Sequence, residues 1–321
     1  MNCTSYNFKE VEMLEDILNK DDLAMDSLII YSDNEGILFE KSSNTKINVR
    51  SIAKLVTSLA CGILIEKSSG NFNEETLIFD ILKDKINISN KKNLNKIKKI
   101  RVKNCLTHTM GYRDIILMSK DIVDNNKDDL LDYALSYPLY YNPGEEFLYS
   151  NAGYYVLAAT MQEYLGYDLY DFINENLFKR LGIINPSWDK YGKYIVGASK
   201  LYLSSNDLLK IGKLILNDGT YEGERIISKD WIRKMSSKIY KNDKDYVDNT
   251  FLSDDFYGYS LWTGKDQIFY ASGTGGQFVI FLKKEGIIIV TTNGGDANKA
   301  PLIKSQIVSI IKDIREEYNG L

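Results

Sequence analysis

The chain has 321 residues, of which 44% are hydrophobic, and this is enough to build one large domain or two lobes around a sizeable core. Its 40 Lys and Arg against 44 Asp and Glu give a formal net charge of -4, which provides no global attraction to nucleic acid. No run approaches about 18 consecutive apolar residues, and the first residues lack the basic and apolar regions of a signal peptide. We therefore expect a cytoplasmic protein that binds neither membranes nor nucleic acid.

Cysteine and histidine are scarce in this chain. The three cysteines, Cys3, Cys61 and Cys105, are too few and too scattered for a disulfide framework or a zinc site. His108 is the only histidine, which excludes His-rich metal ligation and makes any serine triad depend on this one residue. The sequence contains no G-x-S-x-G, P-loop or H-E-x-x-H motif. We therefore expect no metal and no cofactor.

The first elements are predicted to be a helix and a hairpin. Residues 8–20 have the apolar spacing of an amphipathic helix. The segments SLIIYSD and ILFEK, joined by NEG, have the composition of two strands connected by a tight turn. A sheet therefore begins early in the chain.

Residues 49–66, VRSIAKLVTSLACGILIE, place a serine and a lysine one turn apart at the start of a helix that is apolar on nearly every face. Residues i and i+3 share a helical face, so the Lys54 amine can reach the Ser51 hydroxyl, and this activates a weak nucleophile without histidine. The alternative is a helix cap whose lysine extends to solvent. The same spacing also occurs in polar turns and near the end of the last helix: Ser43/Lys46, Ser89/Lys92, Ser187/Lys190 and Ser309/Lys312.

From about 67 to 195 the apolar spacing is helical, with loops rich in Asn, Asp and Lys. In this region the stretch YYNPGEEFLYSNAGYYVLAA has a Pro-Gly turn that leads to Tyr149, Ser150 and Asn151, and an apolar helix follows. Tyr149 and Asn151 are two residues apart, so both can face one cavity. Asn151 is also suited to cap the helix.

The last third of the chain has mainly the composition of strands. It begins with a strand, a capped helix near residue 205 and a second helix. An antiparallel meander is then predicted by the strand composition and turns of YGYSLWTG, QIFYASGTGGQFVIFLK and GIIIVTTNG. The final segment, PLIKSQIVSIIKDIREEY, predicts a closing helix. We therefore predict an α+β fold in a single catalytic unit, with an antiparallel sheet flanked by helices. Its α/β lobe comprises residues 1–66 and 196–321, and a mainly helical lobe, residues 67–195, is inserted between them.

Four motifs occur in one order: SIAK at 51–54, LTHTMGY at 106–112, NPGEEFLYSNAGYY at 142–155 and ASGTGGQ at 271–277. With this order and these separations, most of residues 20–310 resembles the serine beta-lactamase and penicillin-binding-protein superfamily. The resemblance is to the branch related to class C beta-lactamases, with its esterases, D-amino-acid peptidases and nylon-oligomer hydrolases. It implies a beta-lactamase/transpeptidase-like fold.

The resemblance also implies roles for individual residues. Ser51 would be the nucleophile, Lys54 and Tyr149 the proton-transfer pair, and Asn151 a ligand for the substrate and for Lys54. For Lys54 to accept a proton near pH 7, its pKa must fall from about 10.4 by roughly three units, and a Tyr149 phenolate needs a similar change. The sequence leaves open which group is the base, and we expect the two to titrate as a coupled pair.

The edge strand is expected to complete the oxyanion hole. The Ser51 N-H would be one donor, and the stretch Ser272, Gly273 and Thr274 would supply the second donor and substrate contacts. Glycines beside a cavity suit a close approach of backbone to substrate.

This strand is also where the chain departs from the family. The family has a Lys or His ahead of a small residue and Gly, whereas here Ala271 occupies that position, or Tyr270 if the register shifts by one. Both registers lack the cation. Among the aromatic residues near the motifs, Tyr112 and Tyr270 are the first candidates for substrate contacts.

A missing cation predicts the substrate class. Substrates with a carboxylate near the scissile bond would lose a charge-assisted hydrogen bond. We therefore expect a cytoplasmic serine hydrolase that forms an acyl-enzyme with a small-molecule ester or amide substrate. The alternatives are an exported-type beta-lactamase or D-Ala peptidase, which the missing signal sequence disfavours, and a non-catalytic ligand-binding or sensor protein that keeps the fold.

Overall fold

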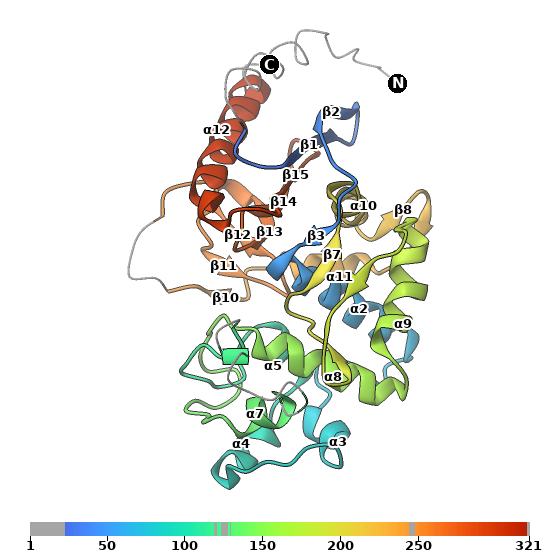
Figure 1. The fold of residues 1–321 in the computed structure, drawn as a ribbon, viewed down its shortest axis with the longest axis vertical. Helices are drawn as coiled ribbons and strands as arrows, with labels where there is room; N and C mark the ends of the chain where they lie inside the picture. The colour runs from blue at the N-terminus through green and yellow to red at the C-terminus, as the bar shows by residue number, and fades with distance from the viewer. Residues whose placement is uncertain (1–22, 119–120, 123–127, 129, 244–247, 320–321) are drawn as a thin grey trace.

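The computed structural model describes residues 23–118, 121–122, 128, 130–243 and 248–319. The helix predicted at residues 8–20 lies outside the described residues. Figure 1 shows a large sheet with its flanking helices in the upper part of the molecule and a mainly helical region below it.

The described elements follow in chain order. The strands are β1 Ser27–Ser32, β2 Gly36–Lys41, β3 Ile47–Asn48, β4 Ser187–Trp188, β5 Lys190–Tyr191, β6 Tyr194–Ile195, β7 Leu201–Leu203, β8 Thr220–Tyr221, β9 Glu224–Arg225, β10 Tyr240–Lys241, β11 Phe256–Tyr257, β12 Trp262–Thr263, β13 Phe269–Gly273, β14 Gln277–Leu282 and β15 Ile287–Thr292. The helices and single turns are η1 Arg50–Ile52, α2 Ala53–Lys67, α3 Ile78–Leu82, η2 Lys91–Asn93, α4 Leu94–Ile97, α5 Val102–Leu106, α7 Leu130–Ser136, α8 Ala152–Leu165, α9 Leu169–Ile173, η4 Asn174–Phe178, η5 Lys179–Leu181, α10 Ser205–Leu216, α11 Lys229–Met235, η6 Lys265–Gln267, η7 Ala297–Lys299 and α12 Ala300–Asn319.

The main sheet has eight strands in the order β10-β11-β12-β13-β14-β15-β1-β2, and every neighbouring pair is antiparallel. The predicted hairpin therefore joins the predicted meander, because β1 pairs with β15 in a register that sets Leu28 opposite Thr291. This confirms the α+β fold with an antiparallel sheet flanked by helices. The division into lobes at residues 66 and 196 stays a prediction.

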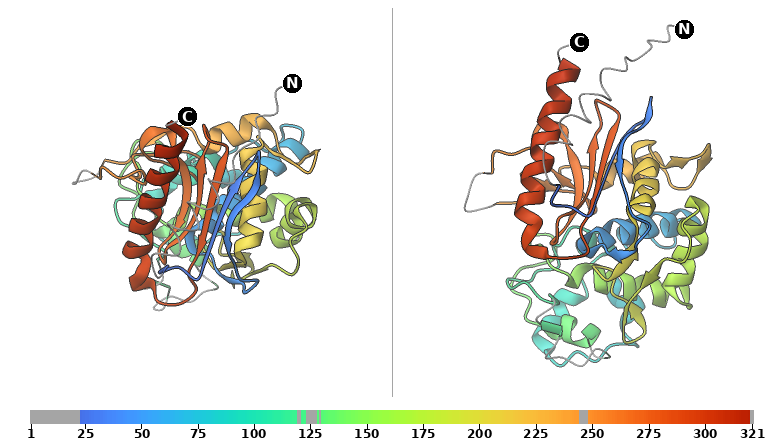
Figure 2. Two further views of the ribbon diagram at one scale, coloured as in Figure 1. Left: turned by 90° about the horizontal axis from the view of Figure 1, so that it is seen from above. Right: turned by 45° about the horizontal axis from the view of Figure 1, so that its top comes forward.

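Both faces of the central strands are covered. Successive side chains of a strand point to opposite faces. Ile29 and Val290 accordingly belong to the core that contains α2 and α10, whereas Leu28 and Ile289 belong to the core that contains α12. Figure 2 shows α12 and α10 on opposite sides of the sheet. Because water reaches neither face, the middle of each of these strands is hydrophobic on both faces, and polar residues stand only near the strand ends.

A second, three-stranded sheet, in the order β3-β7-β4, was not predicted. Its strand β4, together with β5 and β6, lies within residues 187–195, where the sequence predicted only helical spacing. Strands of two residues are too short to show a period of two. This sheet positions the start of α2, because Val49 N-H donates to the Leu201 carbonyl of β7 at 2.9 Å.

Helix α2 runs through the centre of the molecule, as predicted, and every residue from Ala53 to Leu64 is buried. Trp231 of α11 packs on it and donates its indole N-H to the Ser58 carbonyl at 3.0 Å.

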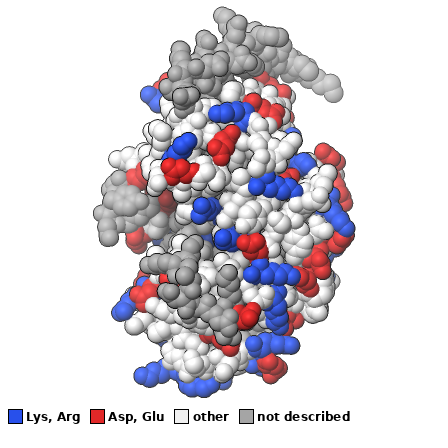
Figure 3. All heavy atoms as spheres, viewed as in Figure 1, with Lys and Arg blue, Asp and Glu red and all other residues white. Residues whose placement is uncertain are grey.

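None of the helices among the described residues is long and apolar enough to cross a membrane. On the face shown in Figure 3, basic and acidic side chains are interspersed.

A glycine in α8 allows close helix packing. A Cβ atom on Gly153 would lie 2.6 Å from the carbonyl oxygen of Cys105 in α5. Because this oxygen belongs to the backbone of a helix, it cannot move aside as the end of a flexible side chain could. We predict that Gly153→Ala lowers the free energy of unfolding in urea by about 1 to 3 kcal/mol. The control is Gly212→Ala in α10, where the nearest atom is a methyl carbon of Ile288 at 3.1 Å, and the loss should be smaller. Equal stability of the two variants would contradict this account.

Candidate active site

Ser51 lies in the turn η1 immediately before α2. The preceding residue, Arg50, has a φ of 54°, a left-handed conformation that few non-glycine residues adopt. The Asn48 side chain fixes this turn, because its Oδ1 accepts hydrogen bonds from Arg50 N-H at 2.9 Å and from Lys200 N-H at 3.2 Å. The serine is thus held in a strained turn that is anchored to the segment leading into β7.

The Lys54 amine is the best-defined group of the site. It lies 3.1 Å from the Ser51 Oγ, 2.9 Å from the Asn151 Oδ1 and 3.2 Å from the Ala198 carbonyl oxygen. Lys54 is only 1% exposed, and no carboxylate forms an ion pair with it among the described residues. Burial therefore lowers its pKa from 10.5 to about 7.

These three contacts suit a neutral amine. Asn151 Oδ1 and the Ala198 carbonyl are acceptors only, so they take the two N-H groups of a neutral Lys54. The remaining lone pair then faces the Ser51 hydroxyl, and a proton can pass from Ser51 to Lys54. The carbonyl of Ala198 was not predicted as part of the site, since a backbone atom leaves no mark in the sequence.

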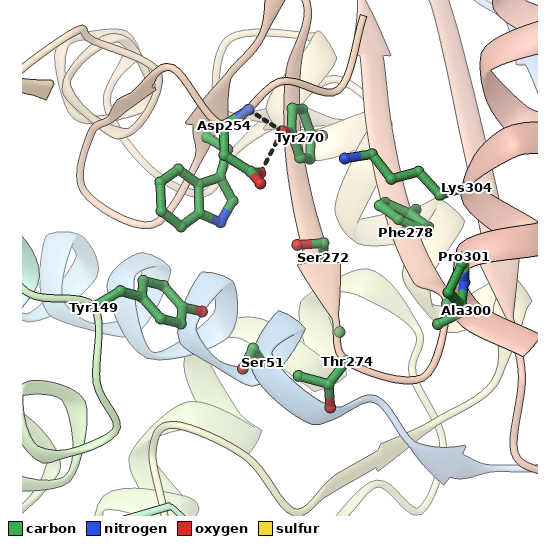
Figure 4. Close-up of a pocket in the computed structure, with 13 residues that line it drawn as sticks. Ser51, Tyr149, Asp254, Tyr270, Ser272, Thr274, Phe278, Ala300, Pro301 and Lys304 are labelled. Atoms are coloured by element: carbon green, nitrogen blue, oxygen red, sulfur yellow. Dashed lines mark hydrogen bonds between the residues drawn. The ribbon is translucent and has the colours of Figure 1, made fainter. Parts of the chain in front are cut away.

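Tyr149 reaches Ser51 from the other side of the pocket (Figure 4). Its ring lies 4.8 Å from the Lys54 amine, 4.5 Å from the His108 ring and 5.2 Å from the Trp262 ring, each measured to ring centroids. Loss of hydration raises the pKa of Tyr149, and this outweighs the opposite effect of its hydrogen bond with Ser51. Tyr149 is therefore a protonated phenol at neutral pH.

Asn151 occupies the cap position of α8, but its side chain makes no capping hydrogen bond. Besides accepting from Lys54, it donates from Nδ2 to the Leu117 carbonyl at 2.9 Å. The predicted contact with Lys54 is thus formed, whereas the capping alternative is not. His108 supports this segment from behind, because its Nδ1 accepts from Ser150 N-H at 3.4 Å.

Strand β13 forms one wall of the site. Tyr270, Ser272 and Thr274 alternate along the chain and line the pocket together with Gly273. Ala271 points to the other face, where it is 3% exposed within the core that contains α2. Of the two predicted positions for the missing cation, only Tyr270 therefore faces this pocket, and neither carries a charge.

Gly273 brings this strand close to the nucleophile. A Cβ atom there would lie 2.9 Å from both the Arg50 Cβ and the Val49 carbonyl oxygen. Only glycine allows the two segments to approach so closely. The backbone of Thr274, which follows, therefore lies near the turn that carries Ser51.

The pocket that contains Ser51 has a volume of about 390 Å³, within the range of small-molecule sites. Its lining adds residues from four other segments, the loop before β11, β12, β14 and α12: Asp254, Trp262, Phe278, Ala300, Pro301 and Lys304. Lys304 of α12 thus supplies the pocket with the cation that the edge strand lacks. Its Nζ lies 3.1 Å from the Asp248 Oδ2. The predicted lack of a cation therefore holds for the edge strand but not for the pocket as a whole, and the preference for uncharged substrates stays a prediction.

Tyr112 does not line this pocket. It is 5% exposed, donates its hydroxyl to the Ala134 carbonyl at 2.7 Å and packs on Tyr137. Its neighbour in sequence, Gly111, makes the tight turn that directs it into the helical region. The expectation of a substrate contact is therefore not met, and we assign Tyr112 to packing.

Sequence comparison identifies the family to which these residues belong. Residues 27–305 match the family described as Beta-lactamase. The chain belongs to the beta-lactamase family. No curated protein sequence matches it.

Solved structures agree on the fold. The octameric penicillin-binding protein homologue from Pyrococcus abyssi is 18% identical, with a TM-score of 0.72 over 96% of this chain and 78% of that one. The penicillin binding protein from Bacillus halodurans is 16% identical, with a TM-score of 0.67 over 92% and 99% of the two chains. EstCE1, a hydrolase with promiscuous acyltransferase activity, is 15% identical, with a TM-score of 0.67 over 94% and 98%. The protein thus has the serine-hydrolase fold of the beta-lactamase family.

The burial of Lys54 predicts a pH-dependent effect on stability. Because its folded pKa is about 7 and its unfolded pKa about 10.5, the unfolded state binds more protons between these values, and wild-type stability rises with pH there. Below pH 7 the folded state bears the full cost of a buried charge. We predict that Lys54→Met is more stable than wild type at pH 6, because it has no buried charge. The difference between their free energies of unfolding in urea should decrease by about 2 to 3 kcal/mol from pH 6 to pH 9.

The matched control is Lys67→Met, which removes an exposed lysine from the same helix. Its effect on stability should not vary with pH over this range. If the stability difference between Lys54→Met and wild type were equally independent of pH, this would contradict the lowered pKa of Lys54.

Proposed function

We propose that this protein is a serine hydrolase that forms an acyl-enzyme through Ser51, with Lys54 as the general base and Tyr149 as a proton donor. One observation carries the proposal: an amine with a pKa lowered to about 7 lies 3.1 Å from a serine hydroxyl that lines a pocket. A structural lysine would not need this combination of burial and pocket. The match to the beta-lactamase family supports the same conclusion.

In the proposed reaction the Ser51 Oγ attacks the carbonyl carbon of an ester or amide, and its proton passes to neutral Lys54. The Tyr149 phenol then gives a proton to the departing oxygen or nitrogen and regains one from Lys54. Water enters, loses a proton to Lys54, and attacks the acyl group, which releases the acid and restores the Ser51 hydroxyl. Both transfers need a base that is neutral near pH 7, and Lys54 meets this condition.

The oxyanion would be bound by backbone N-H groups of Ser51 and Thr274. The close approach of Gly273 to the turn at Arg50 and Val49 supports this arrangement. Preorganised donors of this kind need no reorganisation as negative charge develops.

We infer a small ester or amide as the substrate, because the cavity of about 390 Å³ is lined mainly by aromatic and small side chains. A second candidate is a substrate with a carboxylate, including a beta-lactam. Lys304 supports it as the cation on the pocket wall, although Asp254 on the same wall opposes it.

We predict that a neutral fluorophosphonate probe adds one mass adduct on the peptide that carries Ser51. Lys54→Met and Tyr149→Phe should each slow labelling by about 10² or more, since each removes a proton-transfer group. Intact mass spectrometry against time gives the rates. Hydrolysis of a short-chain chromogenic ester in the same preparation separates a turning-over enzyme from a binding protein that acylates once.

The matched control is Lys304→Met, which removes a pocket lysine that pairs with Asp248 rather than with Ser51. Its labelling rate should stay within a few-fold of wild type. Labelling of Ser51→Ala at the wild-type rate would show that another residue is the nucleophile.

A further inference from the structure

A second pocket, about 590 Å³ in volume, lies where the start of α5 meets the segment that enters β10. The ring of Phe147 lies between this pocket and the one that contains Ser51. It packs on Tyr240, which lines the second pocket, at 6.4 Å, and on Trp262, which lines the first, at 6.0 Å, both between ring centroids. The second pocket is therefore separate from the catalytic one, and a ligand in it would not touch Ser51.

Three cations of the second pocket come from a basic run in the sequence. Residues 91–103 contain seven Lys and Arg and no acidic residue. Of these seven, Lys99, Arg101 and Lys103 line the pocket. Ile100, between the first two, is fully buried, so the chain directs its apolar side chain to the core and the two cations to the pocket. This part of the run is therefore not simply a solvated face.

The three cations keep donors for a ligand. Glu75 pairs with Arg101 Nη1 at 3.2 Å and also with Lys103, which holds both side chains in place. A guanidinium has five N-H donors and an ammonium three, so most donors of these two residues remain available. Lys99 forms no ion pair with any residue that the structure describes.

Positive charge exceeds negative charge at this pocket. Among the nearby carboxylates, Glu74 is paired with Lys234 at 2.8 Å. Glu75 and Glu145 then balance two of the three lining cations, and one positive charge is left over. Glu145 is also turned to its own loop, because it accepts hydrogen bonds from Asn142 N-H at 2.7 Å and Asn142 Nδ2 at 2.6 Å. The pocket therefore favours an anion.

A phosphate group suits this set of donors better than a carboxylate. A phosphate monoester carries about -1.5 to -2 charges at pH 7 and three acceptor oxygens, and arginine binds such oxygens in pairs. Ile239, which is 39% exposed, and Tyr240 add an apolar part to the lining, and the volume leaves room for an organic group. We propose that this pocket binds the phosphate monoester of a small organic molecule, with the phosphate at Lys99, Arg101 and Lys103. The proposal does not depend on the proposed function.

Isothermal titration calorimetry of the wild-type chain at low ionic strength tests the ligand class. The probes are phenylphosphonate, which is a stable analogue of a phosphate monoester, benzoate, uncharged benzamide and inorganic phosphate. We expect phenylphosphonate to bind at least about tenfold more tightly than benzamide, and benzoate and inorganic phosphate to bind more weakly than phenylphosphonate. Equal binding of phenylphosphonate and benzamide would overturn the proposal. Tighter binding of benzoate would also overturn it, because the pocket would then select carboxylates.

Variants locate the bound phosphonate. Lys99→Gln should weaken phenylphosphonate about tenfold and leave benzamide unchanged. The matched control is Lys92→Gln, which removes an exposed lysine of the same run that does not line the pocket. An equal loss in both variants would overturn the proposal, because it would show attraction to the basic run as a whole. A loss in Lys304→Gln without one in Lys99→Gln would place the phosphonate in the catalytic pocket and would overturn it as well.

A substitution on the apolar part of the lining tests where the organic group lies. Ile239 is exposed, so Ile239→Ser leaves the core intact. It should weaken phenylphosphonate several-fold and leave inorganic phosphate unchanged, because only the phenyl ring loses apolar contact. Unchanged binding of phenylphosphonate in Ile239→Ser would contradict this placement of the organic group.

Discussion

The burial of one amine is the constraint on which the rest of this structure depends. Lowering the pKa of Lys54 from 10.5 to about 7 corresponds to about 5 kcal/mol against the protonated form. That is a large fraction of the stability of a typical domain. The fold tolerates this cost because α2 is enclosed on nearly all sides and because Asn151 and Ala198 satisfy the N-H groups of the neutral amine.

The same dry environment acts in opposite directions on two neighbouring groups. Burial disfavours charge, so it lowers the pKa of the Lys54 amine and raises the pKa of the Tyr149 phenol. An amine with a lowered pKa and a protonated phenol therefore lie beside one another at neutral pH, and the proposed mechanism uses this pair as base and acid. His108, the only histidine of the chain, serves instead as a neutral acceptor for Ser150 N-H, the residue between Tyr149 and Asn151.

Local patterns in the sequence were sufficient for much of the fold and for the centre of the site. The apolar run after Ser51 predicted a buried helix, and the strand segments of the last third predicted the meander, because both signals lie within a few residues of chain. The pairing of Lys54 with Ser51 followed from the helix period, because the two residues are three positions apart. The contact of Lys54 with Asn151 was implied by the family resemblance and not by spacing.

The parts that sequence did not predict are set by contacts between distant segments. Lys304 enters the pocket because α12 packs across β14 and β15, and Asp254 does so because Tyr270 holds it. Tyr112 is directed away by the turn at Gly111, although it adjoins a motif. Ala271 faces the core because β13 pairs with β14 in a register that sets it opposite Val279. No short sequence window contains this information.

The proposed role of Lys54 depends on its charge state at neutral pH, and nuclear magnetic resonance can observe this charge state directly. Lysines labelled with 13C at the ε carbon are titrated in the wild-type protein, and the Lys54 signal is assigned by its absence in Lys54→Met. We predict that this signal titrates with a pKa near 7, well below the ordinary lysine value of about 10.4. A Lys54 signal that titrates together with the exposed lysines would contradict the account, because the amine would then be charged at neutral pH and unable to accept the Ser51 proton.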